Sequence, residues 1–424
     1  MSGMNWKAIT RQQWTVFAAV TLGYGLYYVC RLSLSVVKSP LIAEGALTET
    51  QVGLVGSALF YVYAVGKFAN GFLADRVSLR RLFSLGLLVS ALVNLVLGCG
   101  PGFVVFLIAW AINGWSQAMG APASVVSLTR WFDRKQRGTF YGFWSSSHNI
   151  GEGLTFVLTS AVVATAGWRA GFEVAALAGL AGAVVFWTVY RDKRPAETAE
   201  ASANKVRDVG AAQRRVLANP VVWMIALASA AMYVTRYALN SWGIFYFEHA
   251  RGCSTVEAGG LIAVSSVCGV IGTVLSGWIS DVAFKGDRFL PATLFGFMNL
   301  GSLALVFWAP VSWSWAPVVA MVGFGCAIGA LVCYLGGLMA VDVVSPKAAG
   351  AALGVVGIAS YLGAGTQDIL SGWLIGRGKH TAGYDFSAAE ISWVTAASLV
   401  IVFTELARRL HRERGNVDAD DRAT

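Results

Sequence analysis

The 424-residue chain has little charge, because only 13% of its residues are Asp, Glu, Lys or Arg. An ordinary soluble domain is about 25% charged, so the composition argues against a soluble globular protein. Six cysteines and four histidines are scattered without the spacing that is typical of metal sites or disulfide frameworks. No Gly-Lys-Ser/Thr phosphate loop or catalytic-triad spacing is present either. We therefore expect no enzyme activity, no metal and no cofactor.

Apolar residues make up 56% of the chain, and 48 glycines accompany them, which would let transmembrane helices approach closely. Twelve apolar stretches have about the 20 residues that a helix needs to cross a bilayer. They cover roughly residues 14–37, 52–74, 82–99, 103–127, 139–164, 171–190, 219–246, 258–280, 290–308, 316–341, 350–376 and 388–407. The sequence therefore predicts an all-α membrane protein with twelve transmembrane helices.

The basic residues are distributed unequally between the two sides of the predicted membrane spans. Of the 32 Lys and Arg residues, 24 lie in the termini and in the segments that follow even-numbered spans, whereas five lie in the opposite loops. Lys38 is counted among those five. Cytoplasmic loops carry the basic excess, so we expect both termini in the cytoplasm of a bacterium and the chain in its cytoplasmic membrane. This explains the basic pI without a nucleic-acid partner.

A polar, Ala-rich segment at 191–218 separates the sixth and seventh predicted spans. It holds the only long charge cluster between spans and is typical of a solvated tether. We expect a six-helix bundle at 1–190, a cytoplasmic linker at 191–218, a second six-helix bundle at 219–408 and a cytoplasmic tail at 409–424.

The two predicted bundles contain related segments at a constant spacing. "NGFLADRVSLRR" follows the second span and "SGWISDVAFKGDR" follows the eighth, with Asp75 and Asp281 lying 206 positions apart. Arg31 and Arg236 lie 205 positions apart, in the first and seventh spans. These offsets predict two parallel six-span repeats. We expect Asp75, Arg76 and Asp281 to gate the cytoplasmic side through a helix cap or an ion pair; the alternative is that they only anchor the loop.

Three basic residues fall inside predicted spans, namely Arg31, Lys67 and Arg236. A basic residue at the centre of a membrane helix costs roughly 2.5–3.5 kcal/mol, so these side chains should face water or a charge. Arg31 could instead extend outward, because Lys38 and Pro40 mark the end of its span a few residues later. For Lys67 the alternative is an intramembrane ion pair.

Tyrosines accompany both arginines at helical spacing. Tyr24 and Tyr28 lie on one helical stripe with Arg31, while Tyr233 precedes Arg236 by about one turn and Asn240 follows it by one. A guanidinium group matches two phosphate oxygens at once, and a tyrosine hydroxyl can hydrogen-bond an anion or a sugar. Two such arginines, one from each repeat, would clamp a dianion between the bundles.

Nine segments in order resemble one family. They are "YYVCR", "YAVGKFANGFLADR", "NGWSQAMGAP", "RWFDRKQRG", "SSSHNIGEG", "MYVTRYALNSWG", "GWISDVAFKGDR", "PKAAGAALG" and "YLGAG". Together they are similar to the organophosphate:inorganic phosphate antiporters of the major facilitator superfamily, which include glycerol-3-phosphate and hexose-6-phosphate transporters and a related hexose-phosphate sensor. The resemblance implies the major facilitator fold and Arg31 and Arg236 as the phosphate-binding pair. It also implies a pathway lined by Lys67, His148, Tyr24, Tyr28, Tyr233 and Tyr361.

The chain departs from the pattern of this family at several positions. Residues 121–125 are "APASV" where members often carry Trp-Pro-Pro-Cys-Gly, which would leave room for a differently shaped organic group. Glu152 follows His148 by one turn, as His148 follows Trp144, and Asp368 follows Gln367 in the eleventh span. Three roles are open for the two acids: neutralising a basic residue, recognising hydroxyl or amino groups of the substrate, or coupling transport to protons. We expect these positions to determine coupling or specificity.

These observations predict a secondary transporter that exchanges a phosphorylated small metabolite, such as a sugar phosphate or glycerol phosphate, for inorganic phosphate by alternating access. One alternative is a hexose-phosphate sensor that signals to a membrane kinase. A second is a proton-coupled symporter of an organic anion that uses His148, Glu152 or Asp368. We expect a monomer whose partners are the small phosphate compounds and the lipid bilayer.

Overall fold

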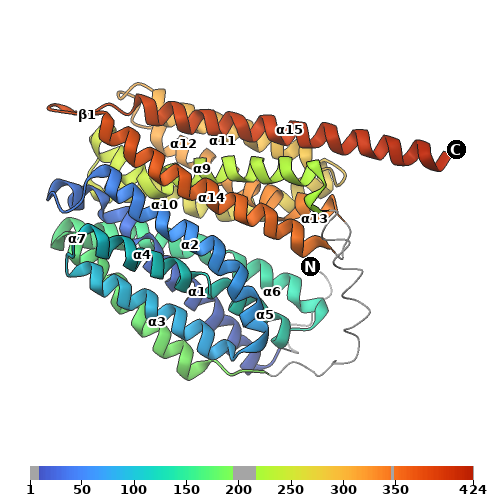
Figure 1. Ribbon diagram of the computed structural model, residues 1–424, viewed down its shortest axis with the longest axis horizontal. Coiled ribbons are helices and arrows are strands. Elements are labelled where there is room, and N and C mark those ends of the chain that lie inside the picture. Colours follow the sequence, from blue (N-terminus) through green and yellow to red (C-terminus); the bar gives the residue numbers. More distant parts are fainter. Residues whose placement is uncertain (1–8, 194–215, 345–347, 424) are drawn as a thin grey trace. The chain divides into compact units, whose positions relative to one another are not determined.

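The computed structural model describes residues 9–193, 216–344 and 348–423, and helices account for most of them (Figure 1). Within these ranges the only strands are β1 (Lys379–His380) and β2 (Gly383–Tyr384), which form a small antiparallel hairpin. The predicted linker at 191–218 lies mostly outside the described residues.

The N-terminal helices follow the first six predicted spans. They are α1 (Arg11–Ala43), α2 (Glu49–Arg76), α3 (Leu79–Gly98), α4 (Phe103–Gln117), α5 (Gly120–Trp131), α6 (Arg134–Ser145) and α7 (Ser147–Val189). The predicted fourth span is divided between α4 and α5, and the fifth between α6 and α7. Helix α7 also includes the sixth span and bends at Gly167, whose φ of 83° is in the left-handed region that favours glycine.

The C-terminal helices follow the remaining spans. They are α9 (Pro220–Arg251), α10 (Thr255–Trp278), the π-helical turn η2 (Ile279–Ala283), α11 (Phe289–Trp308), α12 (Ala316–Cys333), the π-helical turn η3 (Tyr334–Leu338), α13 (Met339–Asp342), α14 (Ala349–Arg377) and α15 (Ser387–Ala423). Ten helical stretches in the described part of the chain are long and apolar enough to cross a membrane. One of them, Thr139–Val189, contains two predicted spans, and α2 covers the predicted span 52–74. The predicted all-α membrane protein is confirmed.

Large apolar side chains lie on the outside of the helices. Leu22 is 70% exposed, Leu177 65% and Val274 65%. A soluble protein would bury such side chains, whereas a bilayer solvates them. The apolar side chains on the outside of the helices therefore agree with the membrane location that the hydropathy of the chain predicts.

The end of the first span differs from the prediction. Helix α1 begins at a capping box between Thr10 and Gln13 and continues through Pro40 to Ala43. Proline removes one backbone donor, so only the hydrogen bond to the carbonyl of residue 36 is lost, and the helix continues for three more residues. Lys38 thus lies inside the helix and is buried, and its assignment to an extramembrane loop was wrong.

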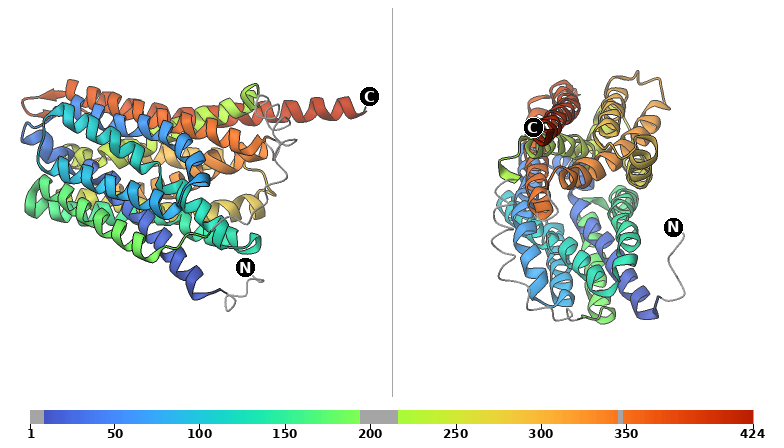
Figure 2. Two further views of the ribbon diagram at one scale, coloured as in Figure 1. Left: turned by 60° about the horizontal axis from the view of Figure 1, so that its bottom comes forward. Right: turned by 90° about the vertical axis from the view of Figure 1, so that its right-hand side faces the viewer.

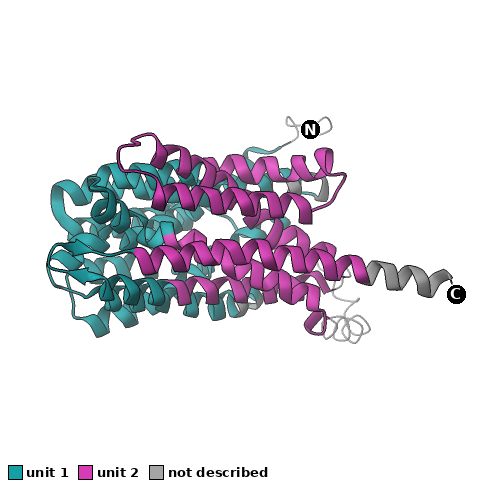
Figure 3. Cartoon of the chain, turned by 90° about the horizontal axis from the view of Figure 1, so that it is seen from above, with its two compact units in different colours: residues 1–196, 239–267, 368–386 teal, residues 197–238, 268–367, 387–424 magenta. Residues whose placement is uncertain are grey.

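The described chain forms two compact units, which Figure 3 distinguishes by colour. Unit 1 comprises Met1–Ala196, Leu239–Val267 and Asp368–Phe386. It therefore contains α1 to α7 together with the end of α9, the start of α10, the end of α14 and the β-hairpin. Both views of Figure 2 show the N-terminal helices, coloured blue to green, running along one another. Helix α1 packs mainly against α7, and a Cβ on Gly151 would lie 2.5 Å from the carbonyl oxygen of Gly25.

Unit 2 comprises Glu197–Ala238, Cys268–Gln367 and Ser387–Thr424. Helix α11 packs against α12 and α15. Helices α10 and α12 approach so closely that a Cβ on Gly272 would lie 2.0 Å from the carbonyl oxygen of Cys326. Close contact through small residues is typical of membrane helices, where backbone packing replaces hydrophobic exclusion from water. The bundle limits predicted at 190 and 219 remain a prediction.

Candidate functional site

Arg31 is buried in unit 1, with 4% of its surface exposed. Its guanidinium carbon lies 4.6 Å from the ring centroid of Tyr63, 5.5 Å from that of Phe60 and 5.6 Å from that of Tyr28. Aromatic faces attract a cation and partly offset the loss of its hydration. The side chain is thus enclosed by rings of α1 and α2, in contrast to the alternative in which it extends outward from the helix.

The predicted tyrosine stripe of α1 meets two other predicted site residues. The ring of Tyr24 lies 4.9 Å from that of Trp144, and the ring of Tyr28 lies 5.6 Å from that of His148. Both tyrosines are buried, whereas His148 is only half-buried. The structure therefore brings Tyr24, Tyr28, Trp144 and His148 together along the contact between α1 and the α6–α7 segment.

The other candidate residues on α2 are Lys67, Asp75 and Arg76. Lys67 lies on α2 with an exposed side chain, one turn after the buried Tyr63. Arg76 is the last residue of α2 and is exposed. The side chain of Asp75 lies outside the described part of the structure, so its predicted gating role stays a prediction.

Arg236 has similar surroundings within unit 2. It is 5% exposed, and its guanidinium carbon lies 5.7 Å from the ring centroid of Tyr237 and 6.0 Å from that of Tyr233. The ring of Tyr233 is 5.4 Å from that of Tyr361 on α14. Gln367 lies further along α14 and is buried as well. The predicted residues Tyr233 and Tyr361 thus gather beside the second intramembrane arginine.

Glu152 on α7 is 2% exposed and accepts a hydrogen bond of 3.2 Å from the side-chain amide of Asn240 on α9. Asn240 follows Arg236 by four residues, one turn of the same helix. Sequence reasoning identified both residues but did not pair them, because 88 positions separate them.

Asp368 forms a buried ion pair with Lys38, and each side chain is 1% exposed. The Lys38 ammonium lies 3.0 Å from Oδ1 of Asp368, donates to the Ser241 hydroxyl at 2.7 Å and lies 3.9 Å from the ring centroid of Trp242. The same carboxylate oxygen accepts from Ser241 at 2.8 Å and from the Trp242 indole at 2.5 Å. We call these four residues the Lys38–Asp368 cluster. The ion pair agrees with the first of the three roles considered for this acid.

Small residues on α2 make room for the Asp368 carboxylate. A Cβ on Gly56 would lie 1.7 Å from Oδ2, and one on Gly53 would lie 2.5 Å from the Asp368 backbone oxygen. Oδ2 is buried and has no hydrogen-bond partner among the described residues. Sequence reasoning missed the role of Lys38; the signal for it was a carboxylate inside an apolar span, which needs a buried counter-charge.

A second ion pair involves Glu49, just before the predicted span 52–74. Oε1 of Glu49 accepts hydrogen bonds from the Lys379 ammonium at 2.8 Å and from the Tyr384 hydroxyl at 2.6 Å. Burial raises the pKa of Glu49, but these two hydrogen bonds, a backbone hydrogen bond and the charge of Lys379 together outweigh it and hold the pKa below its ordinary value. Burial and the bond to Glu49 raise the pKa of Tyr384 to about 12. We call this the Glu49–Lys379 pair.

The second copy of the repeated motif contains an ion pair in unit 2. Asp281 in η2 lies 2.6 Å from Arg288, which also lies 3.6 Å from Asp342 at the end of α13. Asp281 is 62% exposed and Arg288 18%. The predicted gating residue Asp281 therefore connects the start of the loop after α10 with its end.

Residues 20–366 match the family model described as the Major Facilitator Superfamily. Because this match covers most of the chain and the similar proteins are organophosphate transporters and a related sensor, the chain belongs to the major facilitator superfamily and, within it, to the organophosphate:inorganic phosphate antiporter family. This confirms the predicted family.

Three relatives are similar over most of their length. The membrane sensor protein UhpC of Salmonella typhimurium is 30% identical over 381 residues, which cover 85% of this chain and 84% of the relative. A probable hexose phosphate transport protein of Chlamydia trachomatis is 29% identical, covering 82% of each chain. The glycerol-3-phosphate transporter of Bacillus subtilis is 28% identical over 421 residues, covering 94% of this chain and 93% of the relative.

A solved structure supports the fold. A bacterial homolog of the human lysosomal transporter Spinster superposes with a TM-score of 0.75 at 18% identity, covering 95% of this chain and 98% of the other. The predicted major facilitator fold is confirmed.

Proposed function

We propose that this chain is a secondary transporter that exchanges a phosphorylated small metabolite, of the sugar phosphate or glycerol phosphate type, for inorganic phosphate. The observation that carries the proposal is a buried arginine beside tyrosines in each repeat, Arg31 in α1 and Arg236 in α9. The hexose phosphate and glycerol-3-phosphate transporters among its relatives support the substrate class. The transporter would lie as a monomer in the bacterial cytoplasmic membrane with both termini in the cytoplasm.

In this proposal, Arg31 and Arg236 are the residues that bind the phosphate group. A guanidinium group stays charged at physiological pH and makes bidentate, charge-assisted hydrogen bonds to phosphate oxygens. The rings of Tyr28 and Tyr233 lie 5.6 and 6.0 Å from the two guanidinium carbons and form part of their aromatic surroundings. Lys67 and His148 would add charge and a hydrogen-bond donor along the pathway.

Exchange follows from the charge of the two buried arginines. Enclosing two cations in a medium of low dielectric constant is unfavourable, and a bound phosphate offsets that cost. The loaded carrier therefore changes conformation more readily than the empty one. Inorganic phosphate carries the same oxyanion group as the ester, so it serves as the counter-substrate.

The test is exchange of radiolabelled phosphate by purified protein in liposomes. We expect Arg31→Lys and Arg236→Lys each to reduce the exchange rate about 10- to 100-fold, because a lysine loses one charge-assisted hydrogen bond of the fork. Arg169→Lys is the matched control, because Arg169 is 52% exposed and its guanidinium group contacts Glu44 and the Trp168 ring rather than a predicted site residue. Near-normal exchange by either of the first two variants would refute the proposal.

A sensor is the second candidate, favoured by the 30% identity to the membrane sensor protein UhpC. A sensor would bind the phosphate ester and act on a signalling partner such as a membrane kinase, without carrying flux. Binding without counterflow of labelled phosphate in liposomes would favour it.

Uptake that follows an imposed pH gradient without internal phosphate would instead indicate proton-coupled symport of an organic anion. The buried Glu152, bonded to Asn240, is the group that favours this third reading. Glu152→Gln should then abolish the dependence on the pH gradient, whereas in an exchanger phosphate counterflow should persist.

A further inference from the structure

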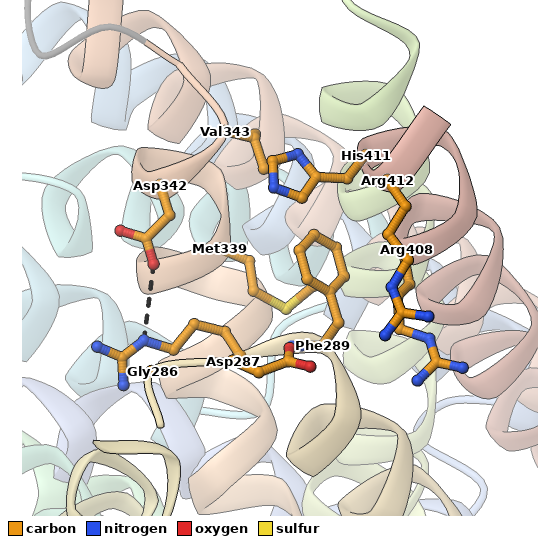
Figure 4. Close-up of a pocket in the computed structure, with 10 residues that line it drawn as sticks. Gly286, Asp287, Phe289, Met339, Asp342, Val343, Arg408, His411 and Arg412 are labelled. Carbon is orange, nitrogen blue, oxygen red and sulfur yellow. Dashed lines mark hydrogen bonds and ion pairs between the residues drawn. The ribbon is translucent and has the colours of Figure 1, made fainter. Parts of the chain in front are cut away.

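A pocket of about 240 Å³ lies within unit 2, and none of the residues proposed above to bind the substrate lines it. Figure 4 shows it between the loop that precedes α11, the end of α13 and one face of α15. Its lining includes the cationic side chains of Arg288, Arg408 and Arg412, the imidazole of His411, and the apolar side chains of Phe289 and Met339.

The pocket lies at the depth of lipid headgroups in the predicted topology. Arg408 directly follows the predicted span 388–407, Asp342 directly follows 316–341, and Phe289 directly precedes 290–308. All three segments are on the side where the excess of basic residues predicts the cytoplasm. The phosphate groups of a bilayer occupy the layer just outside the hydrocarbon core.

Three acidic residues near the pocket, Asp281, Asp287 and Asp342, lie in the segment before α11 and at the end of α13, so the negative charge is concentrated on that side. Arg288 is matched by Asp281 at 2.6 Å and Asp342 at 3.6 Å. Asp287 accepts from the backbone N–H of Phe289 at 2.7 Å and so caps the start of α11.

On α15 the side chains that line the pocket leave a net positive charge. Arg408 lies 2.8 Å from Glu405, yet its Nε is buried without a hydrogen-bond partner in the described part of the chain. Arg412, one turn further, is exposed and takes part in no hydrogen bond or ion pair among the described residues. Figure 4 shows both side chains along the same wall of the pocket. This wall is therefore suited to an anion.

The rest of the lining suits an amphipathic ligand. The His411 ring stacks on the Phe289 ring, with centroids 5.3 Å apart and planes 23° apart. Met339 adds a flexible apolar side chain. Basic pockets between membrane helices at the cytoplasmic surface are suited to the headgroups of anionic phospholipids. We propose that this pocket binds a negatively charged phosphate group, presented by an anionic phospholipid or by a soluble phosphate compound.

The experiment measures lipid binding to purified full-length protein by native mass spectrometry, with phosphatidylglycerol as the anionic probe and phosphatidylcholine as the zwitterionic one. We expect phosphatidylglycerol to bind more tightly, and Arg412→Ala to weaken it about fivefold. Arg412→Lys should retain most of the affinity, because the charge remains.

Arg409→Ala is the matched control. Arg409 is on the same turn of α15, is 71% exposed and does not line the pocket. Equal loss of affinity in Arg409→Ala and Arg412→Ala would mean diffuse attraction to a basic surface and would overturn the proposal.

A second arm uses inorganic phosphate alone in the Arg31→Lys background, where binding at the proposed substrate site is weakened. A soluble occupant would be supported if Arg412→Ala weakens phosphate binding, Arg409→Ala does not, and the two variants bind phosphatidylglycerol equally well. No difference between these variants with either probe would overturn it. Both variants change exposed side chains, so neither should affect folding.

Discussion

Two of the ion pairs in unit 1, the Lys38–Asp368 cluster and the Glu49–Lys379 pair, have similar chemistry and very different surroundings. In the Lys38–Asp368 cluster both side chains are 1% exposed, whereas in the Glu49–Lys379 pair Glu49 is 6% exposed and Lys379 52%. Each pair joins a helix of the first predicted repeat to a segment 330 positions later. A buried pair depends on both members, because either one alone would be an uncompensated charge. A pair with one member open to water is weaker, because water and salt partly screen it.

This difference bears on the proposed transport cycle. Both pairs connect α1 or α2 with the end of α14 or the hairpin that follows it. An alternating-access cycle that separates these segments would have to break both pairs. We expect the Lys38–Asp368 cluster to contribute most of the energy barrier to this separation and the Glu49–Lys379 pair to contribute little.

The largest loss of stability is expected when one charged member of the Lys38–Asp368 cluster is removed. Asp368→Ala should destabilise the protein by about 3–5 kcal/mol, because it leaves the Lys38 ammonium buried without its counter-charge. Unfolding in detergent, followed by circular dichroism, measures this loss.

The double variant Lys38→Met with Asp368→Leu is the control for the charge itself. Replacing both partners by apolar residues of similar size removes the lone charge, so it should recover part of the stability; the rest stays lost because Ser241 and Trp242 no longer have their acceptor. A double variant as unstable as Asp368→Ala would show that packing, rather than the lone charge, causes the loss.

Overpacking next to the same carboxylate should have the next largest effect. Gly56→Ala places a methyl group where Oδ2 of Asp368 now lies, so we expect a loss of about 1–3 kcal/mol in the same unfolding assay. Gly260→Ala on α10 is the matched control, because open space surrounds that position, and it should be neutral or slightly stabilising. Equal losses in both variants would contradict the close packing of α2 against Asp368.

A smaller effect is expected from the Glu49–Lys379 pair, in which Glu49 is buried but Lys379 is half exposed. Glu49→Gln removes the charge but keeps a side chain of the same shape, so the loss should be about 0.2–1 kcal/mol. The same measurement at high salt should reduce the difference from the wild type, because Lys379 is half exposed. A loss as large as that of Asp368→Ala would contradict the contrast between the two pairs.

The dependence on pH should separate the pairs further. Since the pKa of Glu49 is lowered in the folded state, its contribution is complete above its ordinary pKa of about 4.3 and is lost as the pH falls through the lowered value. The melting temperatures of wild type and Glu49→Gln should therefore differ at pH 6 and converge as the pH falls through that window. A difference that persists at the lowest pH would contradict the hydrogen bonds assigned to Glu49.

Much of the candidate site could be predicted because helical periodicity places side chains on a common stripe. Tyr24, Tyr28 and Arg31 share such a stripe, and the structure buries all three. The residue missed was Lys38, because Pro40 was interpreted as the end of the span. A proline ends a helix only when the lost hydrogen bond is not offset, and here packing carries α1 one turn further.

Local sequence by itself determined the membrane class, the predicted helices and the two intramembrane arginines, because each depends on hydropathy and charge over about 20 residues. Tertiary structure alone decided which buried charges meet. Lys38 forms an ion pair with Asp368, which lies 330 positions away. Asn240 donates a hydrogen bond to Glu152, which lies 88 positions away. Such contacts depend on how separate helices pack, and glycines such as Gly56 set that packing by how closely they let two backbones approach.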